Sequence, residues 1–441
     1  MNWIWLGLIL IGIIWAAFTG NMPAVTEQSM EAAKAGVHLI IGFVGPMVFF
    51  LGLMKAVQDA GFLLSVARFL RPILKRLFPD VPEDHPAMGA MVMNMASNML
   101  GLGNAATPFG LKAMEELDKL NTRPGVASNS MVLFLAINTS SITLFPLGVI
   151  AIRSSLGAAS PEAILVPTLV ATICSTTIAI STCFFLQRFP FFRIPANAPE
   201  REIQPTAAMP MQPDSTASET PSSSTSEDWL SRGIVLGSCL LLTAAFIKEL
   251  VQNPSALAGV LPFLSVFGPW LLPLLIAFFL LVGVSGRVRV YESMVEGGKE
   301  GLEVAVRIVP YIVAILVAIA IFRASGALTA LENLVRPLTA AIGMPSEALP
   351  MALMRPLSGS GATGIMMETM TQPGTGPDTF VGMLVSTLQG STETTFYVLA
   401  LYFGAARISN GRHALVTCLT ADAAGILGAV AACRFFFPEL F

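Results

Sequence analysis

The chain has 441 residues, of which 54% are hydrophobic and only 12% are charged, and its formal net charge is −3. This composition predicts a polytopic membrane protein and excludes an ordinary soluble domain. The charge balance gives no reason to expect a nucleic-acid partner, and the five cysteines, which lie in apolar runs without a CxxC pair, indicate neither a disulfide framework nor a metal site.

The first half of the chain predicts four membrane spans and one hairpin. A span needs about 20 mostly apolar residues, and the N-terminal stretch lacks the basic region of a signal peptide, so we expect it to be the first span. A later stretch rich in Gly, Asn and Ser is too polar to cross, and we expect a re-entrant hairpin there. In chain order we expect a span at 3–19, a short interfacial helix at 27–34, a span at 37–57 broken at Gly45-Pro46, an amphipathic helix at 61–78, the hairpin at 87–120, a broken span at 126–152 and a span at 163–186.

A segment rich in Pro, Ser, Thr and Glu, residues 189–228, divides the chain. Its composition predicts a disordered, cytoplasmic linker. It separates a first membrane repeat, residues 1–188, from a second, residues 229–441. In the second repeat we expect spans at 229–251 and 261–284, a polar helix at 290–302, a span at 304–322, an amphipathic helix at 327–342, a second re-entrant hairpin at 347–370, a broken span at 380–405 and a span at 414–433.

The two halves repeat the same order of elements. Ala60-Gly61 comes ten residues before Arg71-Pro72, and Ser325-Gly326 comes ten residues before Arg336-Pro337. In each half an amphipathic helix, a hairpin, a broken span and an unbroken span follow in turn. The span at 229–251 has no counterpart in the first half, so it adds one crossing and inverts the second repeat.

These observations predict an all-α polytopic membrane protein with two inverted repeats, about nine transmembrane helices and two re-entrant hairpins. With a cytoplasmic N-terminus, most Lys and Arg residues fall on the cytoplasmic side, as the positive-inside rule requires. We therefore expect a multi-pass protein of the bacterial inner (plasma) membrane.

Polar residues interrupt both broken spans near mid-membrane depth. Such breaks persist only where protein or a water-filled cavity satisfies them, and interrupted helices of inverted repeats place a binding site at the repeat interface. The alternative is that these side chains only tie helices together. The predicted substrate-binding residues are Asn94, Ser97, Asn98 and Asn104 in the first hairpin, Asn138, Thr139, Ser140 and Ser141 in the first break, Ser358, Ser360 and Thr363 in the second hairpin, and Gln389, Ser391, Thr392, Glu393 and Thr394 in the second break.

Two intramembrane carboxylates, Glu393 and Asp422, are candidates for coupling to a proton or a sodium ion. The alternative for each is a protonated acid that hydrogen-bonds between helices. Arg355, at the mouth of the second hairpin, either binds an anionic group or caps a helix. We expect no other cofactor, no metal and no enzymatic activity, because no nucleophile–base pair or metal-ligand set appears.

The polar stretches carry a resemblance to a known family. Residues 94–108 and 138–141 resemble spore maturation protein A, and residues 355–361 and 390–395 resemble spore maturation protein B, so that the chain resembles a fusion of the two. These proteins belong to the nucleoside recognition, or Gate, group, together with concentrative nucleoside transporters and the membrane core of the ferrous-iron transporter. The resemblance covers nearly all of the chain outside the linker, and it implies re-entrant hairpins and a plasma-membrane location.

We therefore expect a secondary transporter in the lipid bilayer that moves or binds a small polar solute. A nucleoside-like molecule is the first candidate for this solute. The alternative is a non-transporting membrane scaffold or regulator that acts in cell-envelope or spore maturation. The sequence leaves open whether the chain forms a homo-oligomer and whether it has a cell-envelope protein partner.

Overall fold

The computed structural model describes residues 2–101, 103–192, 225–254 and 260–440, and within these ranges the chain is all-helical, as predicted. The first half contains α1 (Asn2–Thr19), α2 (Met22–Asp59), α3 (Phe62–Leu77), α4 (Pro86–Met99), α5 (Gly103–Lys119), α6 (Asn129–Thr139), α7 (Leu147–Ser155) and α8 (Leu165–Leu186), with 3₁₀ turns η1 (Pro161–Ile164) and η2 (Pro190–Phe192). The second half contains α9 (Thr225–Gln252), α10 (Val260–Ser285), α11 (Val290–Ala324), α12 (Ala327–Ala341), α13 (Leu349–Met354), α14 (Gly359–Thr371), α15 (Phe380–Ser391), α16 (Thr395–Ala405) and α17 (Ala414–Phe436), with 3₁₀ turns η4 (Ser346–Ala348) and η5 (Pro438–Leu440).

A glycine in the left-handed conformation starts the same bend in each half. Gly61 (φ +72°) joins α2 to α3, and Gly326 (φ +85°) joins α11 to α12. A side chain would strain this backbone conformation, so glycine lets a long helix turn directly into a second one. The bend between α2 and α3 is 69°. The two glycines that match in the sequence therefore occupy equivalent turns.

Two helices are longer than the sequence predicts. α2 is one continuous helix of 38 residues, so the expected interfacial helix at 27–34 and the expected break at Gly45-Pro46 are both wrong. α11 likewise continues through the expected boundary at 303. A proline removes only one backbone hydrogen bond from a helix, and α2 and α11 pack along each other over their length. This packing stabilises both helices across the residues that suggest breaks.

Glycines allow α2 and α11 to pack closely and antiparallel. A Cβ atom at Gly36 would lie 3.1 Å from the Val313 side chain, and one at Gly52 would lie 2.6 Å from the Met294 carbonyl oxygen. The two helices therefore run in opposite directions. The absence of a side chain at these glycines brings the two backbones together.

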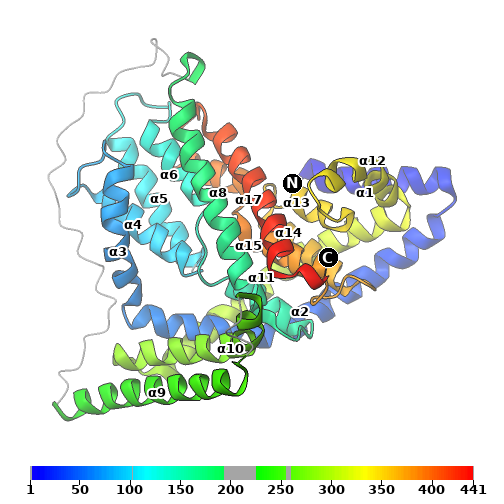
Figure 1. The fold of residues 1–441 in the computed structure, drawn as a ribbon. Helices are drawn as coiled ribbons and strands as arrows, with labels where there is room; N and C mark the ends of the chain where they lie inside the picture. The colour runs from blue at the N-terminus through cyan, green and yellow to red at the C-terminus, as the bar shows by residue number, and fades with distance from the viewer. Residues whose placement is uncertain (1, 102, 193–224, 255–259, 441) are drawn as a thin grey trace.

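The last helices of the two halves, α8 and α17, also pair antiparallel and lie side by side (Figure 1). The Ser175 hydroxyl donates to the Ala421 carbonyl oxygen at 2.8 Å, and Cys183 Sγ lies 3.5 Å from His413 Nε2. In Figure 1, α3, α4 and α5 lie on one flank of this pair, and α12 and α13 lie on the other. Corresponding elements of the two halves therefore occupy opposite flanks.

α1 and α10, the helices that precede the longest helix of each half, pack across onto the other half. Trp5 Nε1 of α1 donates to the Ala314 carbonyl oxygen of α11 at 2.9 Å. In the same manner α10 packs on α2, and Phe278 of α10 contacts Phe62, with ring centroids 5.6 Å apart. α9 packs on α10. The inversion of the second repeat by this helix stays a prediction.

Several helices are long and apolar enough to cross a membrane, which fits a polytopic membrane protein. Among the described residues, Pro161–Leu186, Gly233–Gln252 and Ala414–Phe436 qualify alone, and two bent pairs raise the number to five. The predicted number of nine is not confirmed by this criterion. One reason is that each half of a broken span is short, since α6 and α16 have 11 residues each.

Most of the predicted linker, residues 193–224, lies outside the described residues. At its described ends, Pro190–Phe192 forms a 3₁₀ turn and α9 begins at Thr225. The disorder of the linker and its cytoplasmic side stay predictions.

Candidate functional site

Both predicted helix breaks are present, and the two broken helices run antiparallel. The chain just before α6 meets the chain just after α16, where Ala127 N donates to the Asn410 carbonyl oxygen at 2.9 Å. The chain just before α15 meets the chain just after α7, where Ala159 N donates to Asp378 Oδ2 at 2.8 Å. The start of each broken helix therefore lies beside the end of the other.

Two buried or partly buried arginines strengthen these junctions. Arg153 of α7 donates through Nη1 to the Pro377 carbonyl oxygen at 2.7 Å, and its Nη2 lies 3.5 Å from Asp378 Oδ1. After α16, Arg412 donates through Nη1 to the Ala127 carbonyl oxygen at 3.1 Å and to Asn129 Oδ1 at 2.8 Å. Each half thus contributes an arginine that binds the entry loop of the other half's broken helix.

The two breaks meet directly in the middle. Glu393 N donates to the Thr139 carbonyl oxygen at 2.7 Å. Thr139 is the last residue of α6, and carbonyl oxygens at a helix end have no partner within the helix. Glu393 lies between α15 and α16, so its backbone amide likewise has no partner within a helix. Each break therefore satisfies a backbone group that the other exposes. We call this place the crossing, defined by Thr139–Ser141 and Thr392–Thr394.

The two predicted hairpins form as helix pairs, and each one touches the break of its own half. The turn after α4 is bound through Leu144 N, which donates to the Met99 carbonyl oxygen at 2.8 Å. The turn between α13 and α14 is bound through Phe396 N, which donates to the Pro356 carbonyl oxygen at 3.1 Å. The four polar stretches predicted from the sequence therefore lie together. Whether the hairpins are re-entrant stays a prediction.

Asparagines and a tyrosine form a hydrogen-bonded cluster beside the crossing. Asn138 Oδ1 accepts from Asn98 Nδ2 at 3.0 Å and from the Tyr402 hydroxyl at 3.3 Å. Asn94 Nδ2 donates to the Ala106 carbonyl oxygen at 2.8 Å and lies 3.3 Å from the same hydroxyl. The cluster connects α4, α6 and α16, so it joins the two halves.

Tyr402 was not predicted from the sequence, because it lies eight residues beyond Thr394, the last predicted residue of the second break, within an apolar run. A weak signal was present in its neighbourhood. Val398 and Tyr402 are both buried and stand four residues apart, so they share the inner face of α16. A hydroxyl on the buried face of an apolar helix needs a partner, which the asparagines supply.

Arg355 binds the second break. Its guanidinium donates to the Thr392 carbonyl oxygen and, at 3.5 Å, to Thr394 Oγ1, and its Nη2 lies 3.6 Å from Glu393 Oε2. The Arg355 side chain is only 7% exposed. A buried guanidinium thus holds the extended segment between α15 and α16.

Glu393 turns its side chain away from the packed interior of the crossing, and its proposed coupling role stays a prediction. Its side chain is 50% exposed, whereas those of Thr392 and Thr394 are buried. Both threonines have extended backbone angles, and side chains alternate between opposite faces in an extended segment. The threonines therefore point inward and Glu393 points outward.

Asp422 is the buried carboxylate at this place. It is 3% exposed, and its Oδ2 accepts from the Thr395 hydroxyl at 2.7 Å. Thr395 is the first residue of α16, so Asp422 of α17 is tied to the end of the second break.

Most of the remaining predicted residues make hydrogen bonds within or between these helices. Gln389 connects the second broken helix to the second hairpin, because its Nε2 donates to Thr363 Oγ1 at 3.0 Å. Ser358 caps α14 by accepting from Gly361 N at 3.0 Å, and Ser360 lies 3.4 Å from it. The hydroxyls of Ser97, Thr139, Ser140 and Ser391 bond to carbonyl oxygens of their own helices. Ser141 is buried, and the side chain of Asn104 lies outside the described residues.

Buried polar atoms without a hydrogen-bond partner are concentrated near the crossing. Such atoms are rare in native proteins, because leaving one unsatisfied costs about 1–3 kcal/mol. In the described part of the chain, those on the hairpins, the broken helices and the adjacent α8 and α17 include Asn94 Oδ1, Thr168 Oγ1, Arg355 Nε, Gln389 Oε1 and Asp422 Oδ1. Acceptors and a donor are thus available for a ligand or for water.

A cavity of about 570 Å³ lies elsewhere, between α1, α11, α12, α13 and α14. None of the predicted site residues lines it. The crossing itself is closely packed, since a Cβ atom at Gly359 would lie 2.9 Å from Thr394 Oγ1 and one at Gly390 would lie 2.6 Å from Thr168 Cγ2.

Comparisons with known proteins give consistent matches. The family model described as nucleoside recognition (Gate) matches residues 40–159 and 305–409. Spore maturation protein A of Bacillus subtilis (strain 168) is 42% identical over 193 residues, which are 44% of this chain and 96% of the relative. Spore maturation protein B of the same organism is 48% identical over 160 residues, which are 36% of this chain and 89% of the relative. The two relatives cover different parts of the chain. No solved structure gives a significant match.

Proposed function

Because the chain belongs to the nucleoside recognition (Gate) family, we propose that it is an inner-membrane secondary transporter whose crossing binds a small polar solute, with a nucleoside-like molecule as the first candidate. The observation that supports this proposal most is the group of unpartnered buried polar atoms around two helix breaks. A purely structural junction gains nothing from leaving such atoms unsatisfied.

The chemistry of these atoms suits a neutral solute with several hydroxyl or amide groups. Asn94 Oδ1 and Gln389 Oε1 are acceptors, and Arg355 Nε is a donor. The side-chain amides of Asn94 and Gln389 also donate hydrogen bonds, to Ala106 and Thr363 respectively. These bonds fix the orientation of the two amides. A sugar or a heterocyclic base offers both donors and acceptors, whereas an apolar solute would leave these atoms unsatisfied.

The proposal includes two inverted repeats with about nine spans, two re-entrant hairpins and a cytoplasmic N-terminus. The antiparallel pairing of α2 with α11, of α8 with α17 and of the two broken helices supports it, because a two-fold axis in the membrane plane pairs equivalent helices in this way. Binding at the crossing requires the closely packed breaks to separate. We therefore propose that the hairpins move relative to the broken helices when solute enters, by rocking or by an elevator-like shift.

We propose that Asp422, in preference to Glu393, carries the coupling ion, which is a proton or sodium. Burying an ionised carboxylate without a counter-charge is costly, and Asp422 is buried with one oxygen unpartnered. Glu393 is half-exposed and lies beside the Arg355 guanidinium. We expect Asp422→Asn to retain solute binding and to lose accumulation driven by an ion gradient, whereas Glu393→Gln retains both.

A second candidate is a non-transporting membrane scaffold or regulator in cell-envelope or spore maturation. Two observations favour it: the relatives are named for spore maturation, and the crossing is closely packed. In that case the partner is a cell-envelope protein, and homo-oligomer formation is a further proposal. Neither candidate requires enzymatic activity.

A stabilisation screen of the purified full chain separates the two candidates. We expect nucleosides to raise the midpoint of thermal unfolding, while amino acids, divalent cations and cell-wall precursors do not, because a ligand that binds only the folded state stabilises it. The shift should disappear in Gln389→Met, which removes both polar atoms at similar length. It should persist in Thr177→Val, which removes an exposed hydroxyl that bonds within α8. No shift with any nucleoside would favour the scaffold.

A further inference from the structure

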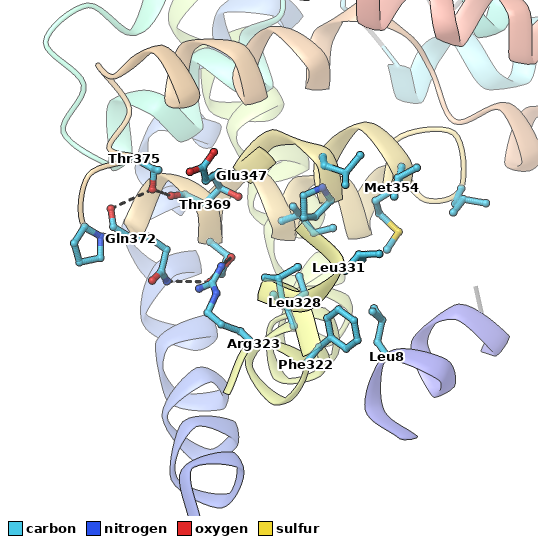
Figure 2. A pocket seen from close by; sticks show the side chains of 18 residues that line it. Leu8, Phe322, Arg323, Leu328, Leu331, Glu347, Met354, Thr369, Gln372 and Thr375 are labelled. Atoms are coloured by element: carbon cyan, nitrogen blue, oxygen red, sulfur yellow. Dashed lines mark hydrogen bonds and ion pairs between the residues drawn. The ribbon is translucent and has the colours of Figure 1, made fainter. Parts of the chain in front are cut away.

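The cavity between α1, α11, α12, α13 and α14 has an apolar part and a charged part (Figure 2). Side chains of Leu8, Phe322, Leu328, Leu331, Leu353 and Met354 form the apolar part. Its volume of about 570 Å³ falls within the range of about 300–1,000 Å³ that is usual for ligand sites. The crossing and its hairpin contacts share none of these residues.

The charged part has both signs of charge. Arg323 donates through Nη1 and Nη2 to the two carboxylate oxygens of Glu368, and the second of these bonds is 2.9 Å long. Gln372 Nε2 donates to Glu368 Oε1 at 2.9 Å. Figure 2 shows Glu347, Thr369, Gln372 and Thr375 gathered on the side of the cavity away from Leu8 and Met354.

Two charged groups remain available for a ligand. Arg323 has five N–H donors, of which the ion pair uses two, and its side chain is 37% exposed. The Glu347 side chain is exposed, and within the described part of the chain its carboxylate accepts a single hydrogen bond, of 3.3 Å, from the adjacent Ser346 hydroxyl. Glu368, in contrast, already accepts three hydrogen bonds. The groups available to a ligand are therefore the remaining N–H donors of Arg323 and the Glu347 carboxylate.

We propose that this cavity binds a zwitterionic aminophospholipid, with one acyl chain among the apolar residues, the phosphate beside Arg323 and the ammonium beside Glu347. Lipid is the occupant that a membrane protein always meets, and its acyl chain matches the apolar lining. An anionic lipid without an ammonium group would leave Glu347 unpaired and place its negative charge near two carboxylates. The mixed charges thus select a zwitterion. This site is independent of the crossing and does not depend on whether the chain transports a solute.

The test uses the purified full chain in detergent and two lipids with identical acyl chains, phosphatidylethanolamine and phosphatidylglycerol. Native mass spectrometry counts the bound lipid, and a phosphatidylethanolamine with a diazirine on one acyl chain maps where the chain lies. We expect phosphatidylethanolamine to bind at least about tenfold more tightly, a difference of about 1.4 kcal/mol. Photolabelling should fall on α11 to α14.

Three variants test the proposed contacts. Leu331→Trp fills the apolar part and should weaken phosphatidylethanolamine binding at least about tenfold, again about 1.4 kcal/mol. Leu334→Trp, on the exposed face of the same helix, is the matched control and should leave binding unchanged. Glu347→Gln alters an exposed residue without endangering folding, and it should abolish the preference between the two lipids.

Equal binding of the two lipids to the wild-type chain would overturn the proposal. So would photolabelling spread over the exposed helix faces, since that pattern indicates surface lipid only. A Glu347→Gln variant that keeps the wild-type preference would also contradict it, even if Leu331→Trp does not fold.

Discussion

The amide nitrogen of Glu393 lies 2.7 Å from the carbonyl oxygen of Thr139, and this hydrogen bond joins helix breaks from opposite halves of the chain. Backbone groups freed by a break are costly to bury in a membrane unless protein or water satisfies them. Here each half supplies what the other lacks. The two breaks therefore depend on each other, and neither half would satisfy its own break alone.

The contact between the breaks predicts a crosslink. With the natural cysteines replaced, cysteines at Ser140 and Thr392 should react with a short bifunctional thiol reagent, because each is adjacent to a residue of the Thr139–Glu393 bond. Gel mobility after cleavage of the chain between its halves reports the product. A control pair, Ser140 with Thr243 of α9, should not crosslink. If the first pair also fails to react, the breaks do not meet.

The Tyr402 hydroxyl should contribute measurably to stability. Tyr402→Phe removes bonds to Asn138 and Asn94 and should lower the free energy of unfolding by about 0.5–1.5 kcal/mol. Tyr397→Phe, on the exposed side of the same helix, should have little effect. Denaturant titration in detergent measures both. Equal effects of the two substitutions would contradict a stabilising role of the Tyr402 hydroxyl in the cluster.

Arg153 should be the more important of the two junction arginines. It is fully buried and binds the carbonyl oxygens of Pro161 and Pro377, so Arg153→Leu should cost about 3–5 kcal/mol by stranding its partners. Arg412→Leu should cost less, because Arg412 is only partly buried. Thermal unfolding of both variants decides this. A smaller loss for Arg153→Leu would contradict the burial argument.

Acid should destabilise the fold through His413, which directly precedes α17. Burial, and secondarily the adjacent Arg412 charge, lowers the pKa of His413 from 6.5 to about 4. The unfolded chain therefore binds a proton that the folded chain excludes between these values. Stability should fall as the pH falls through this window, by at most about 1.4 kcal/mol per pH unit. The unfolding midpoint at pH 7 and pH 5 should differ less for His413→Gln than for the wild type, and an equal difference would exclude His413 as the cause.

The broken helices could be predicted because their polar runs violate the apolar pattern that a membrane span requires. The repeat was visible from Gly61 and Gly326, since glycine adopts the left-handed backbone of these turns without strain. The continuous α2 and α11 could not be predicted. Pro46 suggests a break locally, whereas the long antiparallel packing that overrides it joins residues more than 200 positions apart.

The candidate site was predictable as a set of stretches and less so residue by residue. Glu393 and Asp422 both lie in segments predicted to cross the membrane, and the sequence does not show which of them is buried. Their difference in burial follows from the extended backbone at Thr392–Thr394, which turns Glu393 outward. Tyr402 and the cavity beside Arg323 depend on contacts between distant helices, which no local pattern reports.

Uptake of a radiolabelled nucleoside, uridine, into proteoliposomes that contain the full chain tests the proposed function most directly. Under an inward proton or sodium gradient we expect saturable uptake by the wild-type chain, the same rate for Thr177→Val, and a rate for Gln389→Met that equals that of empty liposomes. Wild-type uptake no faster than that of empty liposomes, or a wild-type rate for Gln389→Met, would contradict solute binding at the crossing.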